Sequence, residues 1–258
     1  MTKTVVIANQ KGGVGKTTTA VNLSAFLARK DKKTLLIDID PQGNSCSGLG
    51  VDLKTRQGDS IYEVLIGKKK ISDVMIKTKY ENLFLVPSNL DLAGAQAELL
   101  SFPKKEFILK NALEEIKKNF DFIIIDTPPS LGLFTLNGLV AADSVLIPMQ
   151  SEFYAMEGLA QLLKAIKMVK TALNKDLSIE GVLITMYDVR TNLSKQVVDE
   201  IRGYFKEKLY NSMVPRNVRL SEAPSHGVDI FEYDPKSPGA ESYIKFGEEF
   251  LQKNGGVR

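Results

Sequence analysis

Short, continuously apolar segments that alternate with amphipathic stretches constrain the fold of this chain more than any other feature. The apolar segments are rich in Val, Ile and Leu, and they occupy residues 5–8, 34–38, 83–87, 122–126, 144–148, 179–186 and 209–214. Strands of this kind are buried on both faces, as in a parallel sheet. The amphipathic stretches predict helices at residues 16–30, 60–66, 104–118, 152–173 and 193–208. This alternation predicts a doubly wound α/β fold, whose mostly parallel sheet is flanked by helices.

The chain has 258 residues and shows no low-complexity linker, internal repeat or break in composition. We therefore expect one domain over residues 1–258, without a separate N-terminal DNA-reading domain because the first apolar segment begins at residue 5. The glycine-containing residues 40–59 predict an irregular loop that can move with the state of a ligand. Neither a signal peptide nor a run approaching the ~20 apolar residues of a membrane span is visible, which predicts a cytoplasmic protein.

Cysteine and histidine are scarce, and this scarcity excludes several kinds of site. The single cysteine, Cys46, excludes an internal disulfide and any metal cluster held by several cysteines of one chain. The single histidine, His226, argues against a histidine-ligated zinc site and against a Ser-His-Asp triad. Any hydrolytic chemistry must therefore use other side chains.

A glycine-rich loop between the first apolar segment and the first predicted helix is the strongest functional signal. It reads Asn9-Gln10-Lys11-Gly12-Gly13-Val14-Gly15-Lys16-Thr17-Thr18. Gln10 stands where an ordinary P-loop has its first glycine, but Gly15-Lys16-Thr17 keeps the functional end. The glycines let backbone N–H groups turn toward phosphate oxygens, and the following helix adds its positive N-terminal end. We expect Lys16 to contact the β- and γ-phosphates and Thr17 to bind Mg²⁺ directly.

Two of the apolar segments end in aspartates that are followed by proline-containing turns. Asp38 ends the second segment, and Asp126 ends the fourth in the form of a Walker B strand. The carboxyl ends of the strands face the crevice where open α/β sheets bind ligands. Because Mg²⁺ keeps several waters in its shell, we expect Asp38 and Asp126 to hold it through water. Asp40, two residues past Asp38, lies further into the loop.

The early lysine of the loop, Lys11, gives the first resemblance to a known family. A second lysine five positions before Lys16 is the deviant Walker A pattern, and with it the chain resembles the ParA/MinD group of P-loop ATPases. Further segments look like those of the small chromosomal ParA proteins, often called Soj; they are residues 38–44, 126–130, 185–188 and 215–225. The last of these segments is long and specific, so it is the main reason why the chain resembles the Soj branch.

The resemblance implies roles for residues inside and outside the loop. Lys11 is expected to reach across a dimer interface to the partner's nucleotide, where a cation stabilises charge on the transferring phosphoryl. Asp40 is expected to position or deprotonate the attacking water, so the expected catalytic residues are Lys11, Lys16 and Asp40. The family's adenine contacts match Pro215 and Asn217, with Met186 nearby. The expected ATP-binding residues are therefore Lys11, Gly12, Gly13, Val14, Gly15, Lys16, Thr17, Thr18, Met186, Pro215 and Asn217.

Basic residues concentrate near the last apolar segments. Residues 186–219 contain seven basic and four acidic residues, an excess of three that equals the net charge of the whole chain. Lys and Arg against phosphates give salt-sensitive affinity without sequence preference. The resemblance implies non-specific binding of double-stranded DNA through Arg190 and Arg219; further candidates are Lys195, Arg202 and Arg216. It also implies an ATP-dependent homodimer, a ParB-like partner that stimulates weak hydrolysis, and association with the nucleoid.

Other functions of related proteins define the alternatives. A MinD-like membrane-cycling ATPase needs a C-terminal amphipathic helix with a basic polar face. Here the stripe of Tyr243, Phe246, Phe250 and Leu251 faces a polar side without net charge, made of Lys245, Glu248, Glu249 and Lys253. We therefore expect this helix to pack on the core and expect no membrane partner. A reductase like the nitrogenase iron protein needs two cysteines per subunit, which Cys46 alone excludes. A nucleotide-dependent regulator of replication initiation uses the same switch and stays open.

Overall fold

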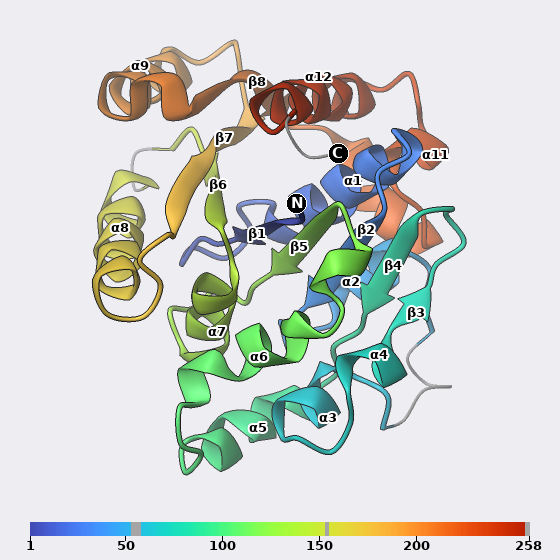
Figure 1. Cartoon of the computed structure of the whole chain (residues 1–258). Coiled ribbons are helices and arrows are strands. Elements are labelled where there is room, and N and C mark those ends of the chain that lie inside the picture. The colour runs from blue at the N-terminus through green and yellow to red at the C-terminus, as the bar shows by residue number, and fades with distance from the viewer. Residues whose placement is uncertain (53–57, 153–154, 256–258) are drawn as a thin grey trace.

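The central sheet of the computed structural model sets the arrangement of everything else (Figure 1). The structure describes residues 1–52, 58–152 and 155–255. Within these ranges the sheet has eight strands in the order β3-β4-β2-β5-β1-β6-β7-β8, and β3 alone is antiparallel to its neighbour. The strands are β1 (Lys3–Ile7), β2 (Thr34–Asp38), β3 (Ile76–Lys77), β4 (Leu83–Val86), β5 (Phe122–Asp126), β6 (Ser144–Gln150), β7 (Ser178–Tyr187) and β8 (Leu209–Pro215). This architecture confirms the predicted doubly wound, mostly parallel α/β fold.

Helices cover both faces of the sheet. They are α1 (Lys16–Arg29), α2 (Asn44–Gly48), α3 (Ile61–Leu65), α4 (Ile71–Val74), α5 (Leu92–Leu99), α6 (Ile108–Glu114), α7 (Leu133–Ala141), α8 (Ala155–Ala172), α9 (Asn192–Phe205), α10 (Val218–Glu222), α11 (Ile230–Tyr233) and α12 (Pro238–Lys253). Short 3₁₀ segments lie at Lys105–Phe107, Lys117–Asn119, Lys206–Lys208 and Ala223–His226. Side chains of α1 and α12 pack on one face of the sheet, and those of α6 to α9 pack on the other.

The two-sided burial explains why the strand segments are continuously apolar. In β1, Val5 and Ile7 belong to the core beneath α1 and α12, whereas Val6 belongs to the core on the opposite face. All three side chains are fully buried. A polar residue at any of these positions would lose its water without gaining a partner, which costs free energy.

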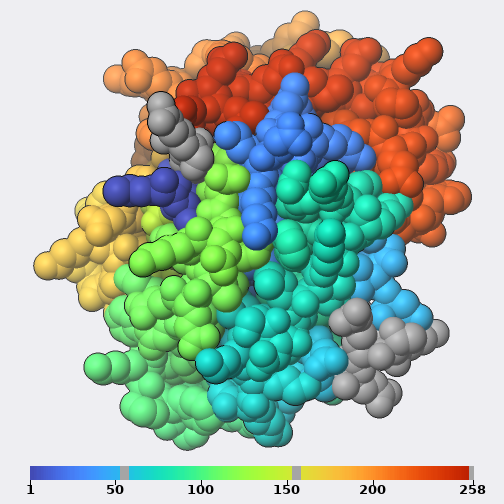
Figure 2. All heavy atoms as spheres, turned by 45° about the vertical axis from the view of Figure 1, so that its right-hand side comes forward, coloured from blue at the N-terminus to red at the C-terminus, as the bar shows by residue number. Residues whose placement is uncertain are grey.

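The last helix, α12, packs on the core as predicted. Tyr243, Phe246 and Phe250 are buried between α1 and β8, and the Glu249 carboxylate accepts hydrogen bonds from the Asn211 and Ser212 amides of β8. In the space-filling view the red surface of this helix adjoins the blue surface around the end of α1 (Figure 2). Among the described residues, no helix is both long enough and apolar enough to cross a bilayer.

Two expected elements differ from those observed. Residues 44–48 of the expected loop form α2, because the buried Asp38 carboxylate accepts the Ser45 N–H at the start of this helix. The helix expected over residues 104–118 is α6 between two 3₁₀ segments, and the Asn137 side chain accepts the Leu109 N–H where α6 begins. Residues 53–57 of the expected loop and residues 153–154 of the expected helix lie outside the described residues.

The strand order brings the functional segments to one edge. β1 lies in the middle, and the chain runs from β1 to β2 on one side but from β5 to β6 across to the other. Parallel α/β sheets bind ligands beyond the carboxyl ends of their strands at such a switch point. The loop after β1, Asp38 at the end of β2 and Asp126 at the end of β5 therefore converge at this edge.

Candidate functional site

The glycine-rich loop connects β1 to α1 and surrounds a cavity of about 360 Å³. Gly13 and Gly15 have φ of 72° and 80°, a region that residues with a Cβ rarely adopt. The loop residues that line the cavity are Gly12, Gly13, Gly15, Lys16, Thr17 and Thr18. The Val14 side chain instead lies in the core, so this residue can offer the cavity its backbone alone. This loop geometry is suited to an anion.

Lys16 is held inside the site before any ligand binds. Its side chain is almost completely buried, and Nζ donates to the Lys11 carbonyl at 3.2 Å. Burial lowers the pKa of Lys16, while the negative charges of Asp126 and Asp40 act in the opposite direction. A lysine that is desolvated in this way gains a strong electrostatic partner when a phosphate enters.

Hydrogen bonds with the neighbouring strands β6 and β7 hold the loop in place. The Asn9 amide donates to the Pro148 carbonyl at 2.7 Å, and the Gln150 amide donates to the Gly13 carbonyl at 2.9 Å. The Thr185 hydroxyl donates to the Val14 carbonyl at 2.9 Å. Sequence reasoning missed Asn9, Gln150 and Thr185 as functional residues. The available signal was their position as polar residues at the ends of apolar strands.

The two strand-end carboxylates meet directly. Asp38 and Asp126 are register partners on β2 and β5, and both are fully buried. Burial raises the pKa of Asp38, and the neighbouring Asp126 carboxylate raises it further. Burial also raises the pKa of Asp126, whereas nearby hydroxyls lower it. Two buried carboxylates that disfavour each other's charge make a position that a cation stabilises.

The hydrogen bonds of this pair leave one carboxylate oxygen for a divalent cation. The Asp38 oxygens accept the Asp40 and Ser45 N–H groups, and Oδ2 of Asp126 accepts the Ser45 hydroxyl. Among the described residues, Oδ1 of Asp126 has no hydrogen-bond partner. Within the same ranges, no three His, Cys, Asp or Glu residues are grouped to hold a metal. This set of oxygens suits Mg²⁺, which completes its shell with water and substrate phosphates.

Asp40 lines the same cavity from the loop after β2. Its Oδ1 accepts the Gln42 N–H at 3.0 Å, which fixes the carboxylate at the entrance to that loop. Cys46 on α2 is buried, and burial raises its thiol pKa to about 12. The thiol is therefore protonated at neutral pH and unsuited to chemistry.

A second cavity of about 200 Å³ adjoins the first and contains the residues expected around adenine. Met186, Pro215 and Asn217 line it, and it shares Gly15 and Thr18 with the phosphate cavity. Asn217 is the N-cap of α10, and its side-chain oxygen Oδ1 accepts the backbone N–H of Arg219. The side-chain NH₂ group of Asn217 is therefore left to donate to a base.

The Lys11 side chain lies apart from the phosphate cavity in this chain, although the Lys11 carbonyl accepts the Lys16 ammonium. This side chain is 37% exposed, and Nζ forms an ion pair with Oε2 of Glu152 at 2.7 Å. Glu152 follows the end of β6 and was not anticipated from the sequence. The structure thus brings Lys16, Thr17, Asp38, Asp40 and Asp126 together, but it does not bring Lys11 to the same cavity.

The expected DNA-contacting arginines lie beside the second cavity. Arg190 follows β7 and is 84% exposed, and its guanidinium pairs with Asp188 at 2.7 Å. Arg219 lies on α10, is 53% exposed and pairs with Glu222 and Asp234. Arg216, between them, donates its N–H to the Tyr187 carbonyl. Lys195 and Arg202 lie on the exposed side of α9, with Arg202 about 10 Å farther along the helix axis.

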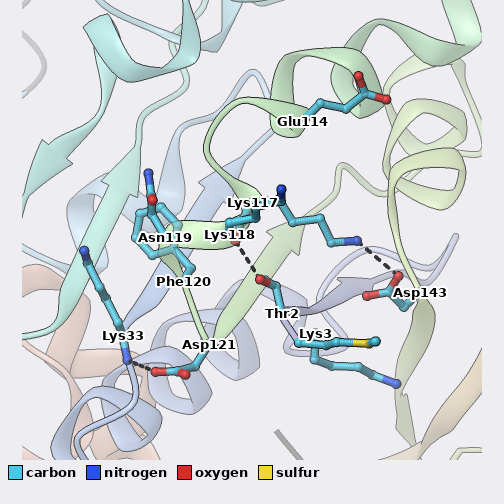
Figure 3. Close-up of a pocket in the computed structure, with 11 residues that line it drawn as sticks. Thr2, Lys3, Lys33, Glu114, Lys117, Lys118, Asn119, Phe120, Asp121 and Asp143 are labelled. Carbon is cyan, nitrogen blue, oxygen red and sulfur yellow. Dashed lines mark hydrogen bonds and ion pairs between the residues drawn. The ribbon is translucent and has the colours of Figure 1, made fainter. Parts of the chain in front are cut away.

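A larger cavity of about 850 Å³ lies at the opposite edge of the sheet (Figure 3). Two of its lysines are already engaged, since Lys117 pairs with Asp143 and Lys33 stacks over Phe84 and Phe120. Glu114 and Asp121 also line it, so its charges are mixed. None of the residues expected at the functional site lines this cavity.

Comparison with known proteins agrees with this geometry. A family described as AAA domain matches residues 2–179. The chain is 54% identical over 249 residues to the sporulation initiation inhibitor protein Soj of Bacillus subtilis, which covers 96% of this chain and 98% of that protein. It is 51% identical over 255 residues to the chromosome-partitioning ATPase Soj of Treponema pallidum, which covers 99% of each.

A solved structure from Mycobacterium smegmatis is also similar. It is named cobyrinic acid a,c-diamide synthase and contains an ATP analog and magnesium. It is 38% identical, with a TM-score of 0.87 over 100% of this chain and 98% of that one. The relatives from Bacillus subtilis and Treponema pallidum are both named Soj, which favours the Soj branch over the MinD-like and reductase branches. Their names and their nearly complete coverage show that this chain belongs to the Soj/ParA family of chromosome-partitioning ATPases.

Proposed function

We propose that this chain is an ATP-driven partitioning switch, in which nucleotide state controls binding to DNA. The observation that carries the proposal is that residues lining the nucleotide cavities also belong to, or support, the segments that carry Arg190 and Arg219. Met186 lines both cavities four residues before Arg190, and Asn217 caps the helix that bears Arg219. A nucleotide that fills these cavities therefore touches the supports of both arginines.

The roles of the phosphate-site residues follow from their positions. Lys16 and the backbone N–H groups from Gly12 to Thr18 bind the triphosphate of ATP. Thr17 would ligate Mg²⁺ directly, with Asp38 and Asp126 holding its waters. When bound there, Mg²⁺ neutralises phosphate charge and orients the β- and γ-phosphates. Asp40 lies at the rim of the cavity and orients the attacking water, a role that suits weak intrinsic hydrolysis.

Lys11 acts on a second copy of the chain. Its separation from the phosphate cavity of its own chain, together with its exposure, supports a role in trans. In an ATP-bound homodimer, the ammonium of each Lys11 reaches the partner's triphosphate and stabilises charge on the transferring phosphoryl group. Residues 1–258 act as one ParA-like domain in this assembly.

Arginine side chains form the centre of the DNA-binding surface, namely Arg190, Arg216 and Arg219. Lys195 and Arg202 extend this surface along α9. Dimerisation doubles the number of phosphate contacts, so weak binding by one protomer becomes useful avidity. Stimulation of hydrolysis by a ParB-like partner then separates the protomers and releases the DNA. The protein is accordingly associated with the nucleoid.

Duplex DNA binding measured with ATP, with ADP and without nucleotide, across a salt series, tests this proposal. We expect binding with ATP alone, a steep decrease with salt, and a parallel monomer-to-dimer shift in light scattering. Equal DNA affinity in the three states contradicts the switch. Indifference to DNA in all three favours a membrane-cycling or purely regulatory role instead.

A further inference from the structure

The end of β6 and the residues just after it contact the phosphate loop at three points. The Pro148 carbonyl accepts the Asn9 amide, Gln150 donates to the Gly13 carbonyl, and Glu152 pairs with Lys11. The first contact is made by a backbone carbonyl of β6 and the second by a β6 side chain, whereas Glu152 lies in a bend two residues past the end of the strand. The first two fix the shape of the loop, whereas the third fixes a side chain.

The contact between Lys11 and Glu152 differs from the other two in its exposure. The two side chains are 37% and 49% exposed, although their Nζ–Oε2 distance is as short as 2.7 Å. Exposed ion pairs contribute little to stability and exchange readily with other partners. A triphosphate carries several negative charges at close range, so it competes for a lysine ammonium better than one solvated carboxylate does.

From this geometry we propose that Glu152 is a positioning residue that holds Lys11 within its own protomer and gives it up when two ATP-bound protomers meet. The proposal rests on the function in trans proposed above for Lys11. The contact makes dimerisation selective for ATP over ADP, because the γ-phosphate of ATP adds negative charge that ADP lacks. A lone protomer or an ADP-bound one therefore keeps the pair, and each dimer that forms breaks two pairs.

Glu152→Gln tests the proposal, because it removes the charge of this side chain and keeps its shape. Each exposed pair contributes a factor of about 1.4 to 5, so losing two pairs should tighten the ATP-bound dimer about 2- to 25-fold. Sedimentation equilibrium with ATP and an Asp40→Ala background gives the dimer dissociation constant without turnover. With ADP, the variant should remain monomeric like the parent protein.

Two matched variants separate this role from a general effect of charge. Glu152→Asp keeps the carboxylate and should stay closer to the parent than Glu152→Gln. Glu114→Gln makes the same charge change at the opposite edge of the sheet and should leave the dimer constant unchanged. Equal tightening by Glu114→Gln overturns the proposal, as does an unchanged or weaker dimer with Glu152→Gln.

Lys11→Ala distinguishes a failure of this inference from a failure of the proposed function. If Lys11→Ala dimerises with ATP like the parent protein, the function of Lys11 in trans is wrong, and the inference falls with it. If Lys11→Ala stays monomeric while Glu152→Gln changes nothing, the inference alone is wrong. Adding Glu152→Gln to Lys11→Ala should give no tightening, since no lysine is left to release.

Discussion

The phosphate loop and the arginine surface lie at the same edge of the sheet, yet they are built in opposite ways. In the phosphate loop the key groups are buried, and neighbouring strands hold the backbone through Gln150 and Thr185. On the arginine surface, Arg190 and Arg219 are exposed, and they pair with Asp188 beside β7, with Glu222 on the same helix as Arg219, and with Asp234. The loop is preorganised, whereas the arginines keep conformational freedom and exchangeable partners.

The difference implies two scales of response to substitution. A buried charge acts in a low dielectric and has no water to replace it, so its removal should change affinity or rate strongly. An exposed charge is screened by salt and solvated when it loses its partner, so its removal should have small, salt-dependent effects. The predictions below proceed from the first scale to the second.

Asp40→Ala should give the largest effect, a loss of ATP turnover of about 100-fold or more, because no water is then oriented toward the γ-phosphate. ATP-dependent dimerisation and DNA binding should persist, since Asp40 contacts neither the backbone that binds phosphate nor the arginines. Steady-state phosphate release and light scattering measure the two properties. Near-normal turnover would remove Asp40 from the mechanism.

Lys16→Ala should weaken ATP binding by roughly 10- to 100-fold, the contribution of a charge-assisted contact. Titration calorimetry with ATP measures the change. Lys118→Ala is the matched control, since this exposed lysine borders the cavity at the opposite edge (Figure 3). Unchanged ATP affinity in Lys16→Ala would contradict the contrast between the two regions.

The sequence predicted the framework of the first region because its signals are local. Continuous apolar segments located the main strands of the sheet, since burial on both faces requires apolar residues throughout. Helix α7 was missed for the same reason, because it is buried almost all around and shows no amphipathic stripe. The helix α2 was missed because the carboxylate that accepts its Ser45 amide is Asp38, at the end of a strand.

The sequence did not reveal how the loop is held. Gln150 and Thr185 lie more than 130 residues from the loop carbonyls that they contact, and only the order β1-β6-β7 brings them there. Glu152 was likewise found only in three dimensions.

The arginines could be listed from charge and resemblance, and two of their acidic partners are close in sequence, since Asp188 lies two residues before Arg190 and Glu222 lies three residues after Arg219. The third partner, Asp234, is brought to Arg219 by the fold. Each acidic partner determines how easily its arginine can leave the ion pair and bind a DNA phosphate instead.

Arg219→Glu should weaken DNA binding by about tenfold at low salt and leave ATP affinity unchanged. It removes one phosphate contact per protomer, so in a dimer the slope of log affinity against log salt should fall by about 2. Fluorescence anisotropy with duplex DNA across a salt series measures both quantities. Lys118→Glu makes the same charge change far from this surface; an equal loss there would mean that net charge alone decides.

Glu222→Gln should have the smallest effect and the opposite sign, a two- to fivefold gain in DNA affinity, because an exposed ion pair no longer competes for Arg219. The Tyr233 hydroxyl can still donate to the remaining carbonyl oxygen, which preserves the local structure. The same anisotropy assay measures the gain, and the gain should vanish in an Arg219→Glu background.

Mild acidification should not imitate the Glu222→Gln substitution. Hydrogen bonds from Arg219 and Tyr233 hold the pKa of Glu222 below its usual value. The carboxylate therefore stays charged at a lower pH than an ordinary glutamate does. Between pH 7 and about pH 5, the affinity ratio of the variant to the parent protein should remain constant. If the two affinities converge in that window, the pair is weaker than its geometry indicates, and Arg219 is as free in the parent protein as in the variant.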